Sequence, residues 1–370
     1  MKKLKRLLSA FLTLVLVITL ASTTLAMENL SSSKTSTIKS YLIGFHVKVD
    51  KEVINTHGGK VKKQFKHIPV VSVELSEQAF DSLSKNPKVA YIEEDAKVSI
   101  NNQTIPWGIP HIQATEAHQQ GFTGKGIKVG IIDTGIDYNH EDLRVVGGTS
   151  VLTGVNDYFD DNGHGTHVAG TIAALDNEIG VIGVAPQADL YAIKALDRYG
   201  NGNYSDVISG IEWAIDQHMD IVNMSLGGTT SSKALKAAVD KAYNSGILLI
   251  ASAGNNGFSK KGSITYPAAY DSVIAVGAVD QQDIRASFSS VGRQLELMAP
   301  GVGIESTFPN NSYSTMNGTS MASPHVVGAA ALMWESQPTL TNVQLRQLLD
   351  ENAVLLGGSF EYGNGVVNLH

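Results

Sequence analysis

The sequence contains no cysteine. This absence excludes disulfide bonds, thiolate metal sites and a cysteine nucleophile. Charged residues make up 17% of the chain and apolar residues 43%, as in an ordinary globular protein, and acidic residues outnumber basic ones by 35 to 28. An acidic chain lacks the basic surface that nucleic-acid binding needs, so we expect no nucleic-acid partner. No internal repeat is visible.

Only the first residues contain a long apolar run. Four basic residues, Lys2, Lys3, Lys5 and Arg6, precede an apolar stretch from Leu7 to Ala21, and the small residue Ala26 follows. The stretch is short for a membrane span, and the pattern predicts a signal peptide, residues 1–26, cut after Ala26. An uncleaved membrane anchor is the alternative. We expect a secreted, extracellular protein without membrane attachment after cleavage, which would need a stabiliser other than disulfides, such as a bound metal.

The rest of the chain divides by charge and by pattern at residue 101. Residues 27–101 have 11 lysines and nine acidic residues, a net charge of +2, whereas residues 102–370 have 13 basic and 26 acidic residues, a net charge of −13. These opposite charges suggest that the two segments dock on each other. Strands are predicted at 41–49, 61–65, 70–75 and 89–93, with helices at 51–57 and 76–86. This β-α-β-β-α-β order indicates a small α+β, ferredoxin-like module.

Residues 102–370 alternate apolar strands with helices. The predicted strands are 127–132, 190–195, 220–224, 247–251 and 273–276, and the predicted helices are 164–175, 204–218 and 232–245. Near-continuous apolar strands between helices predict an α/β domain of three layers, α/β/α, with a mostly parallel central sheet. In such folds the sites lie at the carboxyl ends of the strands.

Two candidate residues occur where a helix is predicted to begin. Ser320 precedes the apolar run Val326 to Trp334, and the N–H groups at a helix start could stabilise an oxyanion, although a lone serine there is also an ordinary N-cap. His164 would open a helix as a general base. His164 and His167 have a spacing that could also suit a metal, but no third ligand lies at a helical offset.

Two further candidates follow apolar strands. Asp133 ends such a strand, so its carboxylate would be buried and would need a partner, or it could cap a turn. Asn255 lies among glycines after another strand, where it could adopt a left-handed turn or direct an amide N–H at an oxyanion. The order Asp133, His164, Asn255, Ser320 on one α/β chain combines these separate signals.

That order and three motifs make the chain resemble the subtilisin family of secreted serine proteases, close to its extracellular Bacillus-type members. The motifs are Asp133-Thr-Gly-Ile-Asp137, His164-Gly-Thr-His-Val-Ala-Gly170 and Gly318-Thr-Ser-Met-Ala-Ser-Pro-His325. The resemblance covers signal peptide (1–26), inhibitory and chaperone propeptide (27–101) and peptidase domain (102–370). The sequence around Ser320 does not fit the Gly-x-Ser-x-Gly elbow of α/β-hydrolases.

The resemblance implies a catalytic triad of Asp133, His164 and Ser320, with Asn255 in the oxyanion hole. Peptide substrates would bind as an extended strand between two segments, with Tyr204 and Leu226 lining an apolar outer pocket and Ala251 to Gly254 forming one wall of the S1 pocket. Thr265 stands where the family often has glycine, and it would narrow that pocket. The substrate-binding residues implied are Gly200, Gly202, Tyr204, Ser225, Leu226, Gly227 and Thr265.

The family's high-affinity calcium loop resembles residues 175–181 of this chain. The implied structural Ca²⁺ would be held by the carbonyls of Leu175, Ile179 and Val181 and the side chains of Asn177, Gln103 and Asp142. Oxygen ligands of mixed type suit this hard cation. A solvated polar loop is the alternative. A second, weaker cation site is expected near the carbonyls of Ala268, Tyr270 and Val273, with Glu296.

The propeptide would act as an intramolecular inhibitor, and self-cleavage near Asn101–Asn102 would leave Gln103 at the new N-terminus to bind calcium. We expect a monomer that cuts protein and peptide substrates. A non-catalytic peptide-binding protein of the same fold and a hydrolase of small esters are the alternatives.

Overall fold

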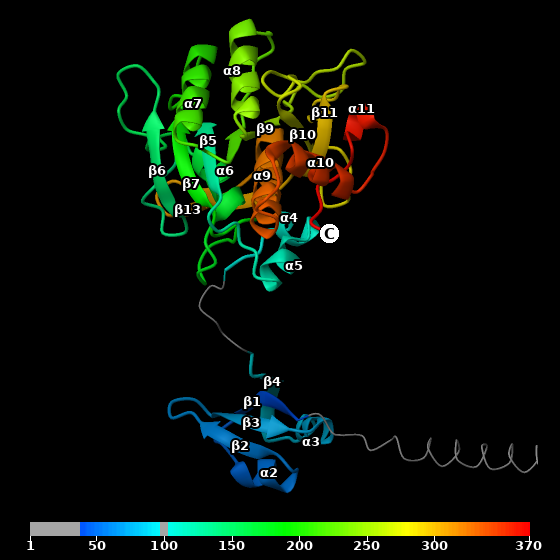
Figure 1. Cartoon of the computed structure of the whole chain (residues 1–370). Coiled ribbons are helices and arrows are strands. Elements are labelled where there is room, and N and C mark those ends of the chain that lie inside the picture. Colours follow the sequence, from blue (N-terminus) through cyan, green and yellow to red (C-terminus); the bar gives the residue numbers. More distant parts are fainter. Residues whose placement is uncertain (1–37, 97–102) are drawn as a thin grey trace, which may run out of the picture. The chain divides into compact units, whose positions relative to one another are not determined.

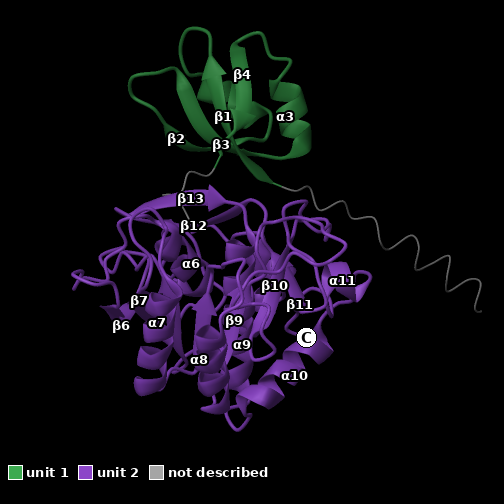
Figure 2. Ribbon diagram, turned by 90° about the horizontal axis from the view of Figure 1, so that it is seen from above, with its two compact units in different colours: residues 1–99 green, residues 100–370 purple. Residues whose placement is uncertain are grey.

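The computed structural model describes residues 38–96 and 103–370. The chain divides into two compact units, residues 1–99 and 100–370, which Figure 2 colours green and purple. The predicted signal peptide and the predicted cleavage point at Asn101–Asn102 lie outside the described residues. The boundaries predicted from the sequence therefore remain predictions.

The first unit is the ferredoxin-like module expected from the pattern. Its four strands pair in the order β2-β3-β1-β4, and every pairing is antiparallel. The predicted first strand is too long, because β1 ends at Phe45, where its register with β4 becomes irregular. The elements are β1 (Lys39–Phe45), α2 (Lys51–Thr56), β2 (Lys60–Gln64), β3 (Val70–Leu75), α3 (Glu77–Leu83) and β4 (Val89–Glu94).

Both helices of this unit begin at side-chain caps, which explains where they start. Asp50 accepts from the N–H of Val53 at 3.3 Å, and Ser76 accepts from that of Ala79 at 3.3 Å. The helices cover one face of the sheet and bury Ile54 and Leu83 against it.

A seven-stranded, fully parallel sheet forms the centre of the second unit (Figure 1). Its strands are ordered β11-β10-β9-β8-β5-β7-β6. The five predicted strands are present, and the two edge strands β6 and β11 were missed. In chain order the strands are β5 (Lys128–Asp133), β6 (Val145–Ser150), β7 (Asp189–Lys194), β8 (Ile221–Met224), β9 (Leu248–Ser252), β10 (Ile274–Val279) and β11 (Leu295–Pro300).

Helices cover both faces of this sheet, which confirms the three-layer prediction. Alternate strand residues face opposite ways: Ile131 packs in the core with α6 (His164–Ala173) and α9 (Thr319–Ser336), whereas Ile132 packs with α7 (Tyr204–Asp216) and α8 (Lys233–Asn244). Helix α9 is buried along most of its length, as its unbroken apolar sequence predicts.

The remaining elements are short or peripheral. They are α4 (Gly108–His111), α5 (Ala114–Gln119), the antiparallel pair β12 (Ile304–Phe308) and β13 (Ser312–Met316), α10 (Asn342–Asn352) and α11 (Ser359–Tyr362). Among the described residues, no helix is long and apolar enough to cross a membrane.

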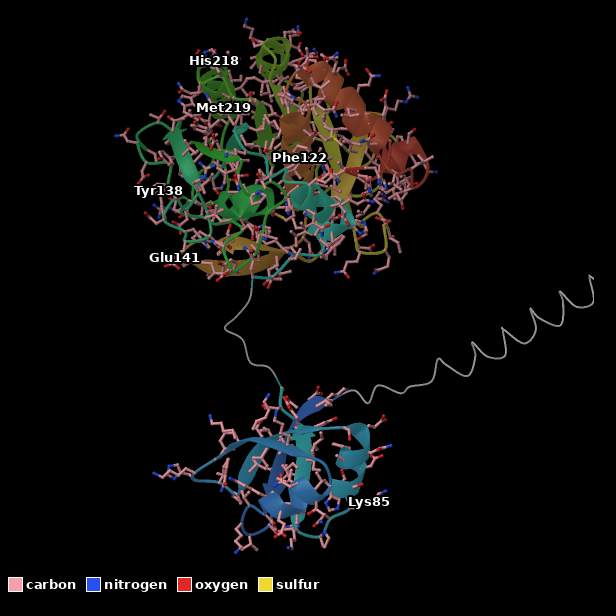
Figure 3. The ribbon with its side chains drawn as sticks, turned by 60° about the horizontal axis from the view of Figure 1, so that its bottom comes forward. Lys85, Phe122, Tyr138, Glu141, His218 and Met219 are labelled. Atoms are coloured by element: carbon pink, nitrogen blue, oxygen red, sulfur yellow. The ribbon has the colours of Figure 1, made fainter. Side chains whose placement is uncertain are left out.

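The strand ends form a carboxyl edge and an amino edge of the parallel sheet, which are distinct from its two edge strands β6 and β11. Tyr138 and Glu141 follow β5 and lie toward one end of the unit in Figure 3, whereas His218 and Met219, which precede β8, lie toward the opposite end. All seven parallel strands end at the carboxyl edge, where Tyr138 and Glu141 lie. Asp133 and the residues after β8 and β9 therefore share one edge.

Candidate active site

Asp133 and His164 form a hydrogen-bonded pair at this edge. Asp133 is the last residue of β5 and is fully buried. His164 is the first residue of α6, and its Nδ1 donates to Asp133 Oδ1 over 2.8 Å. The N–H of Thr134 donates to the same oxygen over 2.7 Å. Because Nδ1 carries the proton, Nε2 of His164 keeps a free lone pair and can act as a base.

Opposing effects set the protonation of His164. Burial disfavours its imidazolium, but the charge and hydrogen bond of Asp133, with the charge of Asp160, outweigh burial and raise the pKa of His164 above its ordinary value of 6.5. A raised pKa makes the imidazole a better proton acceptor. The same carboxylates stabilise the imidazolium that forms when the proton arrives.

Ser320 is the second residue of α9. At this position a backbone N–H has no acceptor within the helix, and the helix dipole adds partial positive charge. Pro324, four residues later, has no N–H, so the carbonyl of Ser320 lacks its helical donor as well. The hydroxyl of Ser225 replaces that donor over 2.9 Å. The backbone of Ser320 is therefore tied to the segment that follows β8.

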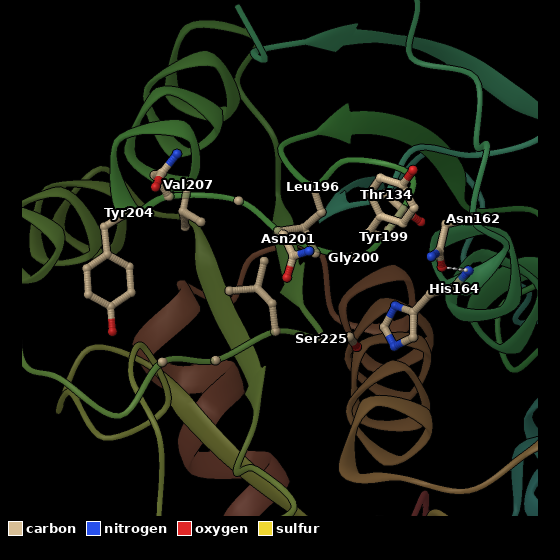
Figure 4. Close-up of a pocket in the computed structure, with 15 residues that line it drawn as sticks. Thr134, Asn162, His164, Leu196, Tyr199, Gly200, Asn201, Tyr204, Val207 and Ser225 are labelled. Carbon is tan, nitrogen blue, oxygen red and sulfur yellow. Dashed lines mark hydrogen bonds between the residues drawn. The ribbon is translucent and has the colours of Figure 1, made fainter.

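The Ser320 hydroxyl donates to the carbonyl of Ser225 over 3.3 Å. No hydrogen bond joins Ser320 to His164 among the described residues. His164 and Ser225 line the same cleft (Figure 4). A serine hydroxyl rotates freely, and catalytic hydrogen bonds commonly tighten only when substrate binds. The fold thus brings the backbones of the three predicted residues to one edge without the bond from Ser320 to His164.

Asn255 lies in the loop after β9 and is held by Thr319. Its Oδ1 accepts from both the N–H and the hydroxyl of Thr319, each at 3.0 Å. An N–H can only donate, so the Asn255 atom that it meets must be the oxygen. Nδ2 is therefore the atom left to donate, and it makes no hydrogen bond within the described residues. The amide is positioned as a donor beside the start of α9.

Comparison with known proteins assigns the family. Residues 124–365 match the model of the subtilase family, and residues 17–101 match that of the peptidase inhibitor I9 family. The chain belongs to the subtilase family. It is 50% identical to subtilisin NAT of Bacillus subtilis subsp. natto over 100% of this chain and 99% of that protein.

Two other relatives match over shorter stretches. This subtilase is 59% identical to subtilisin DY of Bacillus licheniformis over 72% of its own length and 98% of that protein. It is 51% identical to a thermostable alkaline protease of Halalkalibacterium halodurans over 82% and 83% of the two chains. The protein is a serine endopeptidase with an inhibitor segment ahead of its peptidase domain, and the non-catalytic alternative is not favoured.

A cleft of about 460 Å³ opens beside His164. Two backbone segments border it, one after β7 and one after β8. Six of the seven predicted substrate-binding residues line this cleft: Gly200, Gly202, Tyr204, Ser225, Leu226 and Gly227. Its borders therefore suit a peptide strand laid between the two segments of the subtilase.

Thr265, the seventh predicted residue, does not line that cleft, but it contacts the segments that follow β8 and β9. It is 6% exposed, and its hydroxyl donates to the carbonyl of Ala253 over 3.3 Å. A side chain built on Gly227 or on Gly254 would collide with Thr265. Thr265 therefore fills space between the segments that follow β8 and β9.

Asp160 belongs to the site, although the sequence analysis missed it. It is 1% exposed, and its carboxylate accepts five hydrogen bonds of 2.6–3.0 Å, from Thr134 Oγ1, Asn162 N, Gly163 N, Thr166 N and Thr166 Oγ1. The Thr134 hydroxyl accepts in turn from the N–H of Gly165 over 2.9 Å. Asp160 thus joins the turn after Asp133 to the first turn of α6. The sequence signal that could have identified Asp160 was its position four residues before the predicted helix at His164.

Lys194 is a second residue of the site that was not predicted from the sequence. It ends strand β7, and it is only 2% exposed. Its ammonium donates to the carbonyls of Thr134 and Leu196 and, over 2.8 Å, to Asp161 Oδ1. It therefore ties the turn after Asp133 to the segment that borders the cleft. A lysine at the end of an apolar strand was the signal that could have found it.

The predicted calcium loop brings its oxygens together. The Gln103 side-chain nitrogen donates to the carbonyl of Leu175, to that of Val181 over 2.9 Å and to Asn177 Oδ1 over 3.5 Å. Three oxygens therefore converge on one point, where a cation would be well placed. A half-turn of the Gln103 amide would replace its nitrogen there by the amide oxygen, which could then be a fourth ligand of a cation held among the three oxygens. Ile179 lies in the same loop, and its N–H donates to Asn177 Oδ1 over 3.1 Å.

Asp142 is the one carboxylate of this predicted ligand set. It is fully buried; Oδ2 accepts from the Val181 N–H over 3.0 Å and the Tyr313 hydroxyl over 3.2 Å. Oδ1 is buried and makes no hydrogen bond with the described residues, and burial raises the pKa of Asp142. A buried carboxylate oxygen without a partner fits a cation ligand. No three His, Asp or Glu side chains gather as a metal site in the part of the chain that the structure describes.

The guanidinium of an arginine occupies the second expected cation site. The Arg346 guanidinium donates to both oxygens of Glu296, at 2.6 and 2.5 Å, and to the carbonyls of Asp271 and Val273. Glu296 and Val273, which were expected to hold a metal ion, are therefore already paired with a positive charge.

Proposed function

We propose that Ser320 is the nucleophile of this endopeptidase, His164 its general base and acid, and Asp133 the group that orients the imidazole. Ser320 Oγ attacks the carbonyl carbon of the scissile peptide bond while its proton passes to His164 Nε2. The C–N bond then breaks as His164 protonates the leaving amine, and an acyl-enzyme remains. Water repeats the steps and releases the second product.

The oxyanion formed in each step accepts from Asn255 Nδ2 and from the Ser320 N–H. The hydrogen bonds from Thr319 support this role because they leave only the Asn255 nitrogen free to donate. The observation that carries the whole proposal is the meeting of the Asp133–His164 pair, the start of α9 and this amide at one edge of the sheet.

Substrate lies in the cleft as an extended strand between residues 200–202 and 225–227. Tyr204 and Leu226 line an outer apolar pocket at one end of it. The side chain of the residue that supplies the scissile carbonyl enters the space bounded by Ala251 to Gly254, where Thr265 leaves little room. Small residues are therefore favoured at that position over large aromatic ones.

The propeptide inhibits the enzyme until the chain cuts itself near Asn101–Asn102. The match of residues 17–101 to an inhibitor family supports this role. The charges of +2 and −13 on the two segments favour their association. The enzyme is secreted and acts outside the cell as a monomer; its likeness to subtilisins and the apolar run at Leu7 to Ala21 support secretion.

A structural Ca²⁺ is held by Gln103, Asp142, Leu175, Asn177, Ile179 and Val181. The convergence of three oxygens and the unpartnered Asp142 Oδ1 support this assignment. The ion would hold the loop 175–181 closed and resist unfolding in a protein without disulfides.

The proposed function is tested by labelling with a serine-directed phosphonate and by processing of the precursor. We expect one label per molecule, on Ser320, and loss of casein hydrolysis in parallel. In a protease-free host, Ser320→Ala should leave the precursor uncut near Asn101, whereas Ser336→Ala, at an exposed serine that ends α9, serves as a serine control and should be processed. A processed Ser320→Ala protein, or labelling elsewhere, would contradict the assignment. Comparing casein with a nitrophenyl ester distinguishes the endopeptidase from an esterase.

A further inference from the structure

Tyr199 is an exposed aromatic residue at the rim of the substrate cleft. It is 76% exposed, yet it is one of the residues that line the cleft, together with His164 and Leu196. Figure 4 draws Tyr199 at the same end of the cleft as Asn162 and His164, with Tyr204 at the opposite end. An aromatic side chain left in water at a binding cleft loses much of its exposed area when a ligand covers it.

The turn that carries Tyr199 is held by its own hydrogen bonds. Asp197 Oδ1 accepts from the N–H of Tyr199 over 2.8 Å and from that of Asn201 over 3.0 Å. The Asp197 N–H donates to the Asn201 carbonyl over 2.8 Å, and Gly200 closes the turn with a φ of +75°. The backbone position of Tyr199 is therefore fixed before substrate arrives, which lowers the entropy cost of a contact there.

One amide links this turn to the catalytic histidine. Asn162 Nδ2 donates to the carbonyl of Arg198 over 2.9 Å, and Asn162 Oδ1 accepts from the backbone N–H of His164 over 3.1 Å. The residue before Tyr199 is thus joined to the backbone of His164 through a single side chain. Tyr199 is held next to the reacting centre rather than elsewhere on the surface.

The geometry of an extended peptide determines which substrate residue meets Tyr199. Successive side chains of a strand point to opposite sides, and alternate ones are about 6.6 Å apart. If the residue that supplies the scissile carbonyl points toward Thr265, the residue before it points the other way, toward His164 and Tyr199. The side chain two residues further upstream then reaches the Tyr204 end of the cleft.

We propose that Tyr199 is a specificity-determining residue that forms, with Leu196 and the His164 ring, a subsite for a large apolar side chain on the substrate residue immediately before the one that supplies the scissile carbonyl. The inference rests on the proposed function, since it assumes cleavage at Ser320. Aromatic, leucine and similar side chains would cover the Tyr199 ring, whereas glycine would leave it in water.

The test uses the mature enzyme and quenched peptides that differ only at this position, which carries Phe, Leu, Ala or Gly. For the unaltered enzyme we expect kcat/KM for Phe to exceed that for Gly by about tenfold, at the lower end of what a hydrophobic pocket supplies. Tyr199→Ala should reduce the ratio to about twofold, and Tyr199→Phe should keep it. The ratio within one preparation does not depend on the fraction of active enzyme.

Arg198→Ala is the matched control, because this exposed neighbour has a side chain that does not line the cleft; it should keep the full preference. An unchanged preference in Tyr199→Ala, or no preference in the unaltered enzyme, would overturn the subsite while phosphonate labelling of Ser320 stayed normal. If Ser320 were not labelled and no peptide were cut, the proposed function would fail and this inference with it.

Discussion

Thr319 donates both its N–H and its hydroxyl to the side-chain oxygen of Asn255. This pair of bonds determines which end of the amide faces the site. The Thr319 hydroxyl also accepts from the N–H of Gly254 over 3.1 Å, so its own proton is directed to Asn255. The orientation of the proposed oxyanion donor is therefore set by the residue next to the nucleophile.

Asn255→Ala should lower kcat by roughly 10²–10³ with little change in KM, the loss seen for the corresponding asparagine of a related subtilisin. The lost hydrogen bond acts mainly on the transition state, so substrate binding is spared. Steady-state kinetics on one peptide would measure it. Asn256→Ala is the control, because that side chain donates to the Ser263 carbonyl instead. Equal losses in both variants would show a loop defect rather than a lost donor.

Asp160→Asn should shift the acid limb of kcat/KM to lower pH and reduce kcat by about 10- to 100-fold. Catalysis needs neutral His164, and the charge of Asp160 helps raise its pKa above 6.5. Removing that charge lowers the pKa, so the neutral form persists at lower pH. A pH profile, normalised by active-site titration, measures the shift. Asp157→Asn, an exposed neighbour, is the control; an unmoved midpoint in Asp160→Asn would reduce Asp160 to a structural role.

Thr265→Gly should raise kcat/KM for substrates with Phe before the scissile bond about tenfold relative to those with Ala. Thr265 packs where side chains on Gly227 or Gly254 would collide with it, so its removal opens space beside the proposed pocket. Competition between the two peptides in one tube measures the ratio directly. Thr265→Ser removes only the methyl group and should give an intermediate ratio. A ratio unchanged in both variants would place the pocket elsewhere.

Chelation should shorten the half-life of thermal unfolding, by up to about 100-fold when the reference buffer holds calcium at 100 times its Kd. Asp142→Asn should need more calcium for the same half-life, because it loses the one negative charge of the proposed ligand set. Both measurements use processed enzyme whose Ser320 has been blocked by the serine-directed phosphonate, so that autolysis cannot contribute, and they follow unfolding by circular dichroism. Asp216→Asn, exposed on α7, is the control. A half-life insensitive to chelator would count against the loop as a calcium site.

The central strands of the parallel sheet were predictable from the sequence, whereas its two edge strands, β6 and β11, were not. Strand β5 has no polar residue from Val129 to Ile132 because both of its faces are covered by helices. Strand β6 contains Gly147 and Gly148 and is mostly half-buried, and β11 carries Glu296. Such edge strands lack the continuous apolar signal on which the prediction depended.

The sequence by itself determined the order Asp133, His164, Asn255, Ser320 and the placing of each at a strand end or helix start. Those are local properties, set by apolar periodicity and by breaks in it. Only the tertiary structure decided how the side chains are held: Asp160 joining two turns, Asn162 joining His164 to the Tyr199 turn, and Arg346 paired with Glu296. Such contacts join residues far apart along the chain, and their distances and directions exist only once the sheet has brought the strand ends together.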